Sequence, residues 1–227
     1  MQTLLLSIFV FIALHLIPAA PRVRSALIAA LGKPVYIVGY SILSLALLAW
    51  VGMAYAGADY IELWPQAVWM RWVPALLMLP ACILLVGSLS HANALSVAVR
   101  ADQFDPQKPG IASITRHPLM WALMLWALAH MVPNGDAASL VMFGLFLALG
   151  AVGPKSLDMK ARRQLGAERW AELAGPTSNI PFAAALKGRA RIDWRGVLGG
   201  LPTWGGLVLY AVLMGAHVHA IGVSPLP

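Results

Sequence analysis

Six apolar stretches separated by short polar segments dominate this chain. They cover residues 3–18, 35–56, 73–95, 119–132, 137–153 and 204–222. A helix of about 20 apolar residues spans the hydrocarbon core of a bilayer, and these stretches approach that length. The segment Pro133-Asn134-Gly135-Asp136 predicts a tight turn between two antiparallel helices. The pattern predicts an all-α polytopic membrane protein, with about six transmembrane helices in one bundle and a single domain over residues 1–227.

Composition and charge support a membrane protein. Of the 227 residues, 60% are hydrophobic and 11% are charged, whereas about 25% are charged in an ordinary soluble domain. This excludes a water-soluble domain, and it excludes intrinsic disorder, which needs low hydrophobicity. The net charge of +7 is too sparse and too interrupted by apolar runs for nucleic-acid binding.

The basic residues predict how the helices are oriented. Fifteen of the sixteen Lys and Arg lie in the first, third and fifth connecting segments, Arg100 in the third among them, and Arg71 is the exception. Basic segments resist translocation, so these three loops are expected on the cytoplasmic side of a bacterial inner membrane. Both termini are then periplasmic. The lipid bilayer is the first expected partner.

The fifth connecting segment, residues 154–203, is the only long one. Residues 155–173 mix cations, acids and apolar side chains at roughly helical spacing, and residues 193–201 again mix charge with Trp194. This pattern favours interfacial helices on anionic lipid headgroups. A lid over a site open to the cytoplasm is the alternative.

Histidines within apolar stretches are the candidate ligands. His15, His130, His217 and His91 lie in four different stretches, and ionisable groups at such depth often mark functional sites. A neutral histidine bonded to a neighbouring helix is the structural alternative for each. His117 and His130 are separated by about 20 Å along one helix and cannot share an iron. His15 and His130 differ in depth by less than about two turns, so a haem plane could lie between them.

The single cysteine limits the cofactor chemistry. Cys82 alone permits neither an internal disulfide nor a covalent haem-attachment motif. Any haem would therefore be a non-covalent b type with two imidazole ligands.

Several short strings, read together, resemble the NnrU family of membrane proteins and its relative, the 15-cis-zeta-carotene isomerase. Thr115-Arg116-His117-Pro118 is followed by Ala129-His130 and Asn134-Gly135, and later by Thr177-Ser178 and further strings. The family motif positions in this chain are Arg116, His117, Pro118, Asn134, Pro181, Phe182, Gly188 and Arg189.

The resemblance implies a haem b with His15 and His130 as axial ligands. His217 or His91 would be a substitute ligand or a neighbour that supports one. NnrU proteins are associated with nitrite and nitric oxide metabolism, so a redox or ligand-responsive haem in denitrification is expected. The isomerase relative implies the alternative of haem-dependent cis–trans isomerisation of a carotenoid. The ligand is then a nitrogen oxide or a hydrophobic small molecule, and whether the chain is an enzyme stays open.

Two further alternatives come from other classes. Arg116-His117-Pro118 is similar to a string in isoprenylcysteine carboxyl methyltransferases, which bind S-adenosylmethionine beside it. Met120 and Trp121 stand here where those enzymes have a tyrosine, which favours a shared ancestral fold over shared chemistry. The second alternative is a cofactor-free accessory subunit of a larger membrane complex.

Overall fold

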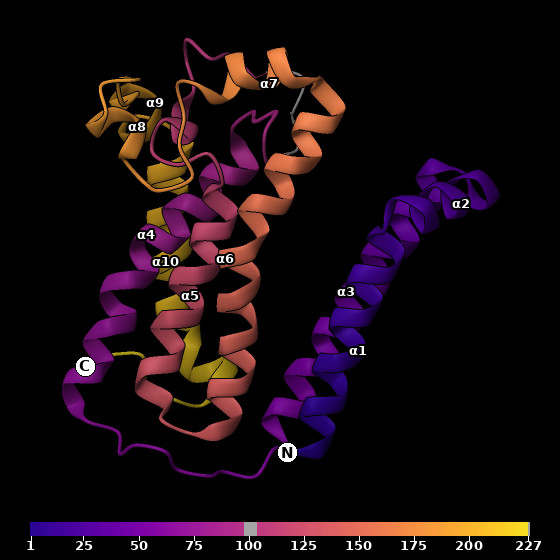
Figure 1. Cartoon of the computed structure of the whole chain (residues 1–227). Coiled ribbons are helices and arrows are strands. Elements are labelled where there is room, and N and C mark those ends of the chain that lie inside the picture. The colour runs from indigo at the N-terminus through magenta and orange to yellow at the C-terminus, as the bar shows by residue number, and fades with distance from the viewer. Residues whose placement is uncertain (98–103, 227) are drawn as a thin grey trace. The chain divides into compact units, whose positions relative to one another are not determined.

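The computed structural model describes residues 1–97 and 104–226, and its named elements are all helical. The predicted all-α fold is confirmed, while the predicted loop residue Arg100 lies outside the described residues. The elements are α1 (Gln2–Ala19), α2 (Pro21–Leu31), α3 (Lys33–Ala56), η1 (Val68–Arg71), α4 (Trp72–Ser90), η3 (Gly110–Ser113), α5 (Pro118–Asn134), α6 (Ala137–Leu165), α7 (Ala167–Ala174), α8 (Ala183–Leu186), α9 (Trp194–Leu198) and α10 (Leu201–Ile221) (Figure 1).

Each of the six apolar stretches contributes a helix, but the helices differ in reach. Four segments are long and apolar enough to cross a membrane, namely Lys33–Ala56, Val68–Ser90, Ala137–Leu165 and Trp194–Ile221. The pair α1 and α2, bent by 75°, is a fifth candidate as a broken span or re-entrant loop. Helix α5 has 17 residues, about 25 Å of helix against about 30 Å of hydrocarbon. The predicted number of six spans therefore stays a prediction.

The chain divides into two compact units. Unit 1 comprises Met1–Pro65 and Gly135–Leu145, and unit 2 comprises Gln66–Asn134 and Phe146–Pro227. In unit 1, α1 packs against α3. The hydroxyl groups of Tyr36 and Tyr40 on α3 donate to the backbone carbonyls of Pro18 and His15, at 3.1 and 3.2 Å. These two bonds hold the last turns of α1 against α3.

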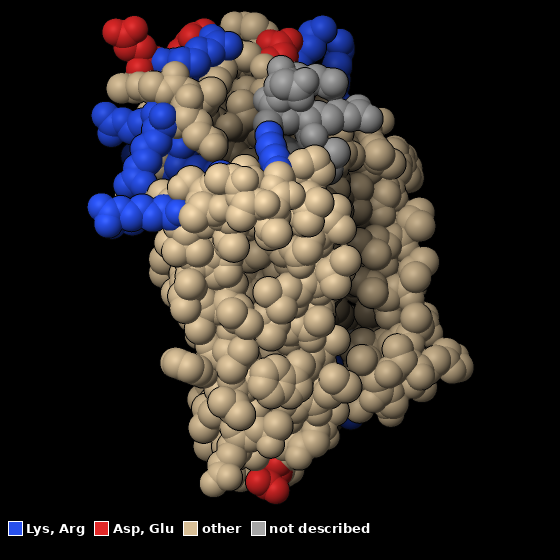
Figure 2. Space-filling model, turned by 90° about the vertical axis from the view of Figure 1, so that its right-hand side faces the viewer, with Lys and Arg blue, Asp and Glu red and all other residues tan. Residues whose placement is uncertain are grey.

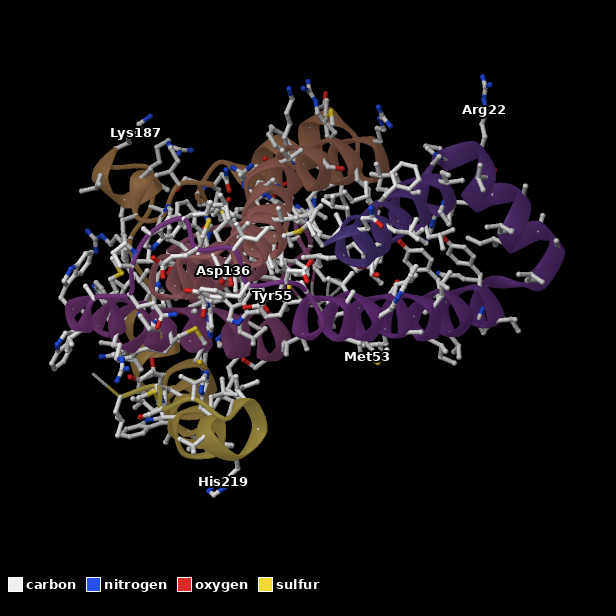
Figure 3. The ribbon with its side chains drawn as sticks, turned by 90° about the horizontal axis from the view of Figure 1, so that it is seen from below. Arg22, Met53, Tyr55, Asp136, Lys187 and His219 are labelled. Atoms are coloured by element: carbon white, nitrogen blue, oxygen red, sulfur yellow. The ribbon has the colours of Figure 1, made fainter. Side chains whose placement is uncertain are left out.

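The start of α6 is fixed within unit 1 by a capping carboxylate. Asp136 accepts a hydrogen bond from the backbone N–H of Ser139 at 2.9 Å and so caps the helix. The Ser139 hydroxyl lies 2.8 Å from the hydroxyl of Tyr55 on α3, and Figure 3 shows Tyr55 beside Asp136. Gly135 has a φ of +66°, and a Cβ there would come within 2.4 Å of the Trp64 carbonyl oxygen. The predicted break between α5 and α6 is confirmed, and it requires glycine.

Unit 2 is built around α4, which packs against both α5 and α10. A Cβ on Gly206 of α10 would lie 2.7 Å from the Cα atom of Ile83, so the two backbones are in close contact. A Cβ on Gly150 of α6 would similarly lie 2.4 Å from the Cγ atom of Met124 on α5. Small residues allow this close approach of apolar helices, in which packing replaces the hydrophobic effect as the main stabilising term.

The predicted start of the fifth connecting segment is wrong, because α6 extends beyond it. That segment was expected to begin at Pro154, but Pro154 lies inside α6, which continues to Leu165. The residues after Pro154 are mostly good helix formers, so one missing backbone hydrogen bond does not end the helix. The helix ends at Gly166, whose φ is +82°. The helical character expected for residues 155–173 is confirmed by the end of α6 and by α7.

The prediction that His91 lies within an apolar helix is wrong, because α4 ends before it. The third apolar stretch was expected to run to Leu95, but α4 ends at Ser90 and His91 has extended backbone angles. The side chain of Asn93 accepts from the N–H of Leu95 at 3.0 Å, a local bond that competes with the helix. His91 is therefore a residue of the connecting segment and does not lie within a membrane helix.

Charged side chains are segregated from the apolar body of the chain. On the face drawn in Figure 2, Lys and Arg gather at one end, and the surface below them is almost entirely uncharged. This distribution is expected when the apolar part faces lipid, because a Lys or Arg at the centre of a bilayer is costly.

Candidate functional site

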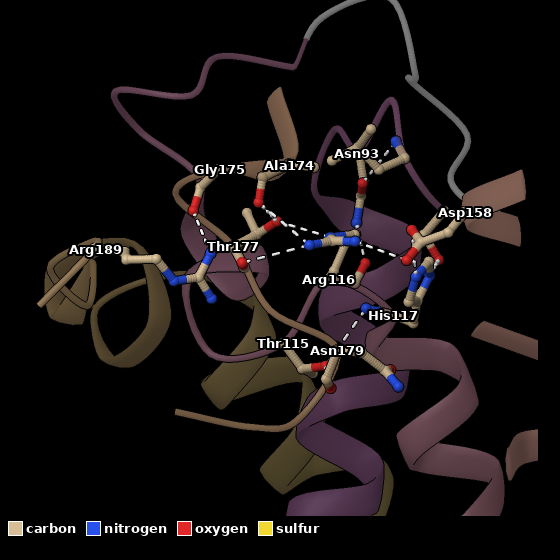
Figure 4. A network of polar contacts seen from close by, with 12 residues as sticks. Asn93, Thr115, Arg116, His117, Asp158, Ala174, Gly175, Thr177, Asn179 and Arg189 are labelled. Carbon is tan, nitrogen blue, oxygen red and sulfur yellow. Dashed lines mark hydrogen bonds and ion pairs between the residues drawn. The ribbon is translucent and has the colours of Figure 1, made fainter. Parts of the chain in front are cut away.

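A buried polar network stands at the beginning of α5. His117 has an exposed fraction of 0% and Arg116 one of 8%, although both directly precede an apolar helix. Figure 4 shows their side chains directed toward Asp158 of α6 and toward the segment after α7. Charged groups are rarely buried unless they are paired and hydrogen-bonded, so the partners determine what this network can do.

Arg116 uses all three of its guanidinium nitrogens. Its Nη1 donates to Asp158 Oδ2 at 2.7 Å, and its Nε donates to Thr177 Oγ1 at 2.9 Å. Its Nη2 donates to the carbonyl oxygens of Ala174 and Thr177, at 3.2 and 3.4 Å. A single guanidinium thereby ties the start of α5 to α6 and to the end of α7.

His117 also uses both of its ring nitrogens. Its Nδ1 lies 3.0 Å from the Ser96 hydroxyl oxygen, and its Nε2 lies 3.1 Å from Asp158 Oδ1. Asp158 therefore receives one charged or polar donor on each oxygen.

The backbone of the same region joins two strings that lie far apart in the sequence. The N–H of Arg116 donates to the carbonyl of Ser178 at 2.7 Å, and the N–H of Phe182 donates to the carbonyl of Ile114 at 2.8 Å. Asn179 gives its carbonyl to the hydroxyl of Thr115 at 2.7 Å. Residues 114–116 and 178–182 are thus paired along their length.

His15 and His130, the two predicted iron ligands, share a local arrangement. Nδ1 of His15 lies 2.7 Å from the carbonyl oxygen of Phe11, and Nδ1 of His130 lies 2.8 Å from that of Trp126. In each case the carbonyl belongs to an aromatic residue one turn earlier, whose ring lies against the imidazole at centroid distances of 4.0 and 5.5 Å. Because a carbonyl only accepts, Nδ1 carries the proton and Nε2 the lone pair.

Both histidines are half-buried, and they belong to different units: His15 to unit 1 and His130 to unit 2. His217 is in unit 2 with His130, and it lies within electrostatic range of that imidazole. Its Nδ1 also bonds a backbone carbonyl, that of Val223, at 2.7 Å.

His91 and His219 are placed differently. The ring of His91 packs on Gly110, where a Cβ would come within 2.2 Å of the ring atom Cδ2. Burial lowers the pKa of His91, and the negative charge of Asp193 partly opposes this. His219 points away from α10 (Figure 3). Among residues 1–97 and 104–226, no three His, Cys, Asp or Glu side chains meet in a group that could hold a metal ion.

Comparison with protein-family models identifies the chain. The model described as "NnrU protein" matches residues 3–225, nearly the whole length. The chain belongs to the NnrU family. No curated protein and no solved structure matches it.

In this NnrU protein, the structure brings several of the motif positions together. Pro118 begins α5 directly after the polar network, and Pro181 and Phe182 are the last two residues of the paired segment 178–182. Phe182 has a φ of +63°, and it is the only non-glycine residue with positive φ in the described chain. Gly188 has a φ of +67°, and the Nη1 atom of Arg189 donates to the carbonyl of Gly175 at 2.7 Å.

Asn134 is the motif position that lies apart from this group. Its side-chain amide donates to the carbonyl of His130 at 2.6 Å, so it closes the last turn of α5. It is thus attached to one of the candidate ligand histidines and not to the polar network.

Two features of this NnrU protein escaped the sequence analysis. Asp158 was read as one of several charges in a polar segment, although it is the shared acceptor of Arg116 and His117. The aromatic residues Phe11 and Trp126 were not singled out. Their signal is present in the sequence, because both candidate ligands are preceded by an aromatic residue at the fourth position back.

Proposed function

We propose that this NnrU protein is a six-helix protein of the bacterial inner membrane that holds one haem b through His15 and His130 and acts in nitrite and nitric oxide metabolism. The family membership supports the membrane location and the general class. The haem proposal rests on one observation: the Nδ1 atoms of His15 and His130 both bond a backbone carbonyl one turn earlier, which leaves Nε2 as the ligating atom in each ring.

The donor chemistry fits a haem iron. A histidine that ligates a metal almost always donates its other ring N–H to a carbonyl or carboxylate, which fixes the ring and makes the ligand more basic. Nδ1 of His15 and Nδ1 of His130 each have such a carbonyl at 2.7 and 2.8 Å. In this tautomer Nε2 is the ligating atom. His217 has the same bond and is the natural substitute ligand.

Residues of this chain would determine how the two imidazoles are oriented and which molecules reach the haem. When bound, a haem supplies an iron that changes oxidation state or binds a small diatomic ligand. The rings of Phe11 and Trp126 lie against the two imidazoles and limit their rotation. The helices that carry the two histidines are mostly apolar, and apolar surroundings would restrict the access of water and favour small or hydrophobic ligands.

An absorption spectrum tests the haem directly. The protein is purified in detergent from haem-replete cells, and a Soret band that shifts on dithionite reduction is expected. His15→Ala and His130→Ala should each reduce or shift this band. His219→Ala is the matched control, because that side chain points away from α10 (Figure 3), and it should leave the spectrum unchanged. A colourless preparation, or equal spectra for all three variants, would contradict the proposal.

Phe11→Leu and Trp126→Leu separate the haem site from a merely structural histidine. If a histidine only forms its structural hydrogen bond and binds no iron, removing its aromatic neighbour should not change the haem absorption spectrum. If the imidazoles ligate iron, these variants should shift the Soret maximum or the reduction potential while the helix content stays unchanged. Circular dichroism of the same samples provides the folding control.

The proposed topology places both termini in the periplasm. Fifteen of the sixteen Lys and Arg follow the first, third or fifth apolar stretch and precede the next one, and this bias supports the orientation. Alkaline phosphatase, which is active only outside the cytoplasm, should be active when fused after residue 226 and inactive when fused within residues 187–191. The opposite pattern would reverse the orientation, and activity at both sites would contradict the six-span count.

A further inference from the structure

Two residues that line a cleft beside the buried network each carry a polar atom that nothing in the described chain satisfies. The cleft has a volume of about 330 Å³ and is lined by α6 together with Trp170 of α7 and Asn179. The indole N–H of Trp170 and the side-chain oxygen of Asn179 are both buried, and neither has a hydrogen-bond partner in residues 1–97 and 104–226. Buried polar atoms are normally paired, so two such atoms on residues that line one cleft point to a bound group.

The two orphaned atoms have complementary requirements. The Trp170 N–H needs an acceptor and the Asn179 oxygen needs a donor. The indole ring itself is firmly held, because the guanidinium groups of Arg116 and Arg162 lie over it at 5.4 and 5.8 Å from its centroid. The orphaned N–H is therefore a fixed feature of the cleft. A ligand that offers both an oxyanion and a hydroxyl group would satisfy both atoms.

The charge of the cleft selects an anion. Lys155 and Arg162 line it, and neither forms an ion pair among the described residues. Asp158 also lines the cleft, but its carboxylate is already paired with Arg116 and hydrogen-bonded to His117. The uncompensated charge that faces the cleft is thus positive.

The lower wall of the cleft is apolar and continues into the membrane segment. Ala151 and Pro154 of α6 line this part, while Lys155 follows Pro154 directly and Arg162 lies about two turns after it. The cleft therefore lies where α6 changes from an apolar to a charged helix. Phosphate groups of lipids occupy this level of a bilayer, where basic pockets bind them.

From these observations we infer that the cleft binds the glycerophosphate headgroup of an anionic phospholipid. Lys155 and Arg162 contact the phosphate, the Trp170 N–H donates to an ester or phosphate oxygen, and a headgroup hydroxyl donates to Asn179. The first carbons of the acyl chain lie against Ala151 and Pro154. This site is independent of the proposed haem.

Lipid binding by the purified full-length protein tests the inference. Native mass spectrometry in detergent compares phosphatidylglycerol, which has headgroup hydroxyls, with phosphatidylcholine, which has none. Phosphatidylglycerol should bind more tightly. Arg162→Gln should weaken this binding about fivefold. Arg163→Gln removes the same charge from the next residue, which does not line the cleft, and should leave binding unchanged.

Asn179→Leu separates recognition from folding. The variant removes an unsatisfied oxygen, so the melting temperature without lipid should stay the same or rise. The preference for phosphatidylglycerol over phosphatidylcholine should decrease but not vanish, because Lys155 and Arg162 still favour the anionic lipid. Equal effects of Arg162→Gln and Arg163→Gln, or equal binding of the two lipids to the unaltered protein, would overturn the inference. Competition by free glycerol 3-phosphate at similar concentration would also overturn it, because the occupant would then be a soluble ester.

Discussion

Replacing Asp158 by asparagine should destabilise the protein much more than an equivalent change at the surface. Arg116 is 8% exposed, and the Asp158 side chain is 25% exposed. Removing one partner of a buried ion pair costs about 3–5 kcal/mol, because the remaining charge is left without compensation. Asp158 is partly solvated and asparagine keeps one acceptor oxygen, so we expect about 2–3 kcal/mol.

The chain provides a matched control for this change. Arg169 and Glu172 form an ion pair with an N–O distance of 2.6 Å, close to the 2.7 Å of Arg116 and Asp158. Their side chains are 53% and 59% exposed, and such exposed pairs contribute about 0.2–1 kcal/mol. Glu172→Gln should therefore have a small effect, although the same type of contact is lost.

The assay is thermal unfolding followed by circular dichroism in one detergent at one scan rate. For a chain of this size about 1 kcal/mol corresponds to about 2–4 °C, so Asp158→Asn should lower the melting temperature by about 4–12 °C. Glu172→Gln should lower it by less than about 3 °C. Equal shifts for the two variants would refute the reasoning that burial, and not the contact itself, determines the contribution of the pair.

Two further predictions concern packing and pH. Gly206→Ala should lower the melting temperature by several degrees, since its Cβ would collide with the backbone of Ile83, whereas Gly215→Ala, with no atom within 4 Å of its Cβ, should be neutral. Burial lowers the pKa of His91 from its ordinary value of 6.5 despite Asp193. The unfolded chain therefore takes up this proton first, and stability should fall as the pH drops below about 6.5. His91→Gln should reduce that loss between pH 7.5 and 5.5, and an unchanged pH profile would contradict it.

The helices follow from local sequence, which is why the sequence could predict them. The apolar stretches contain few residues that end a helix, and the third stretch, which contains Asn93, ends its helix early at Ser90. The break at Gly135 needs a backbone conformation that glycine adopts readily. The end of α6 could not be found in this way. Pro154 usually indicates a boundary, but the helix-forming residues that follow outweigh it, and the helix stops only at Gly166.

The candidate ligand histidines also show what sequence position can predict and what depends on the fold. Position within an apolar stretch singled out His15, His130 and His217, because a polar group in such a stretch is exceptional whatever the fold. The same criterion failed for His91, which the early end of α4 at Ser90 puts outside the helix.

The amino-acid sequence by itself determined the helical class, the apolar segments and the family, since each depends on residue type and local order. Only the tertiary structure decided the role of Asp158, which accepts from Arg116 and His117 some 40 positions earlier. It also decided the pairing of residues 114–116 with 178–182. A contact between distant segments depends on the path of the whole chain, and residue type alone does not encode that path.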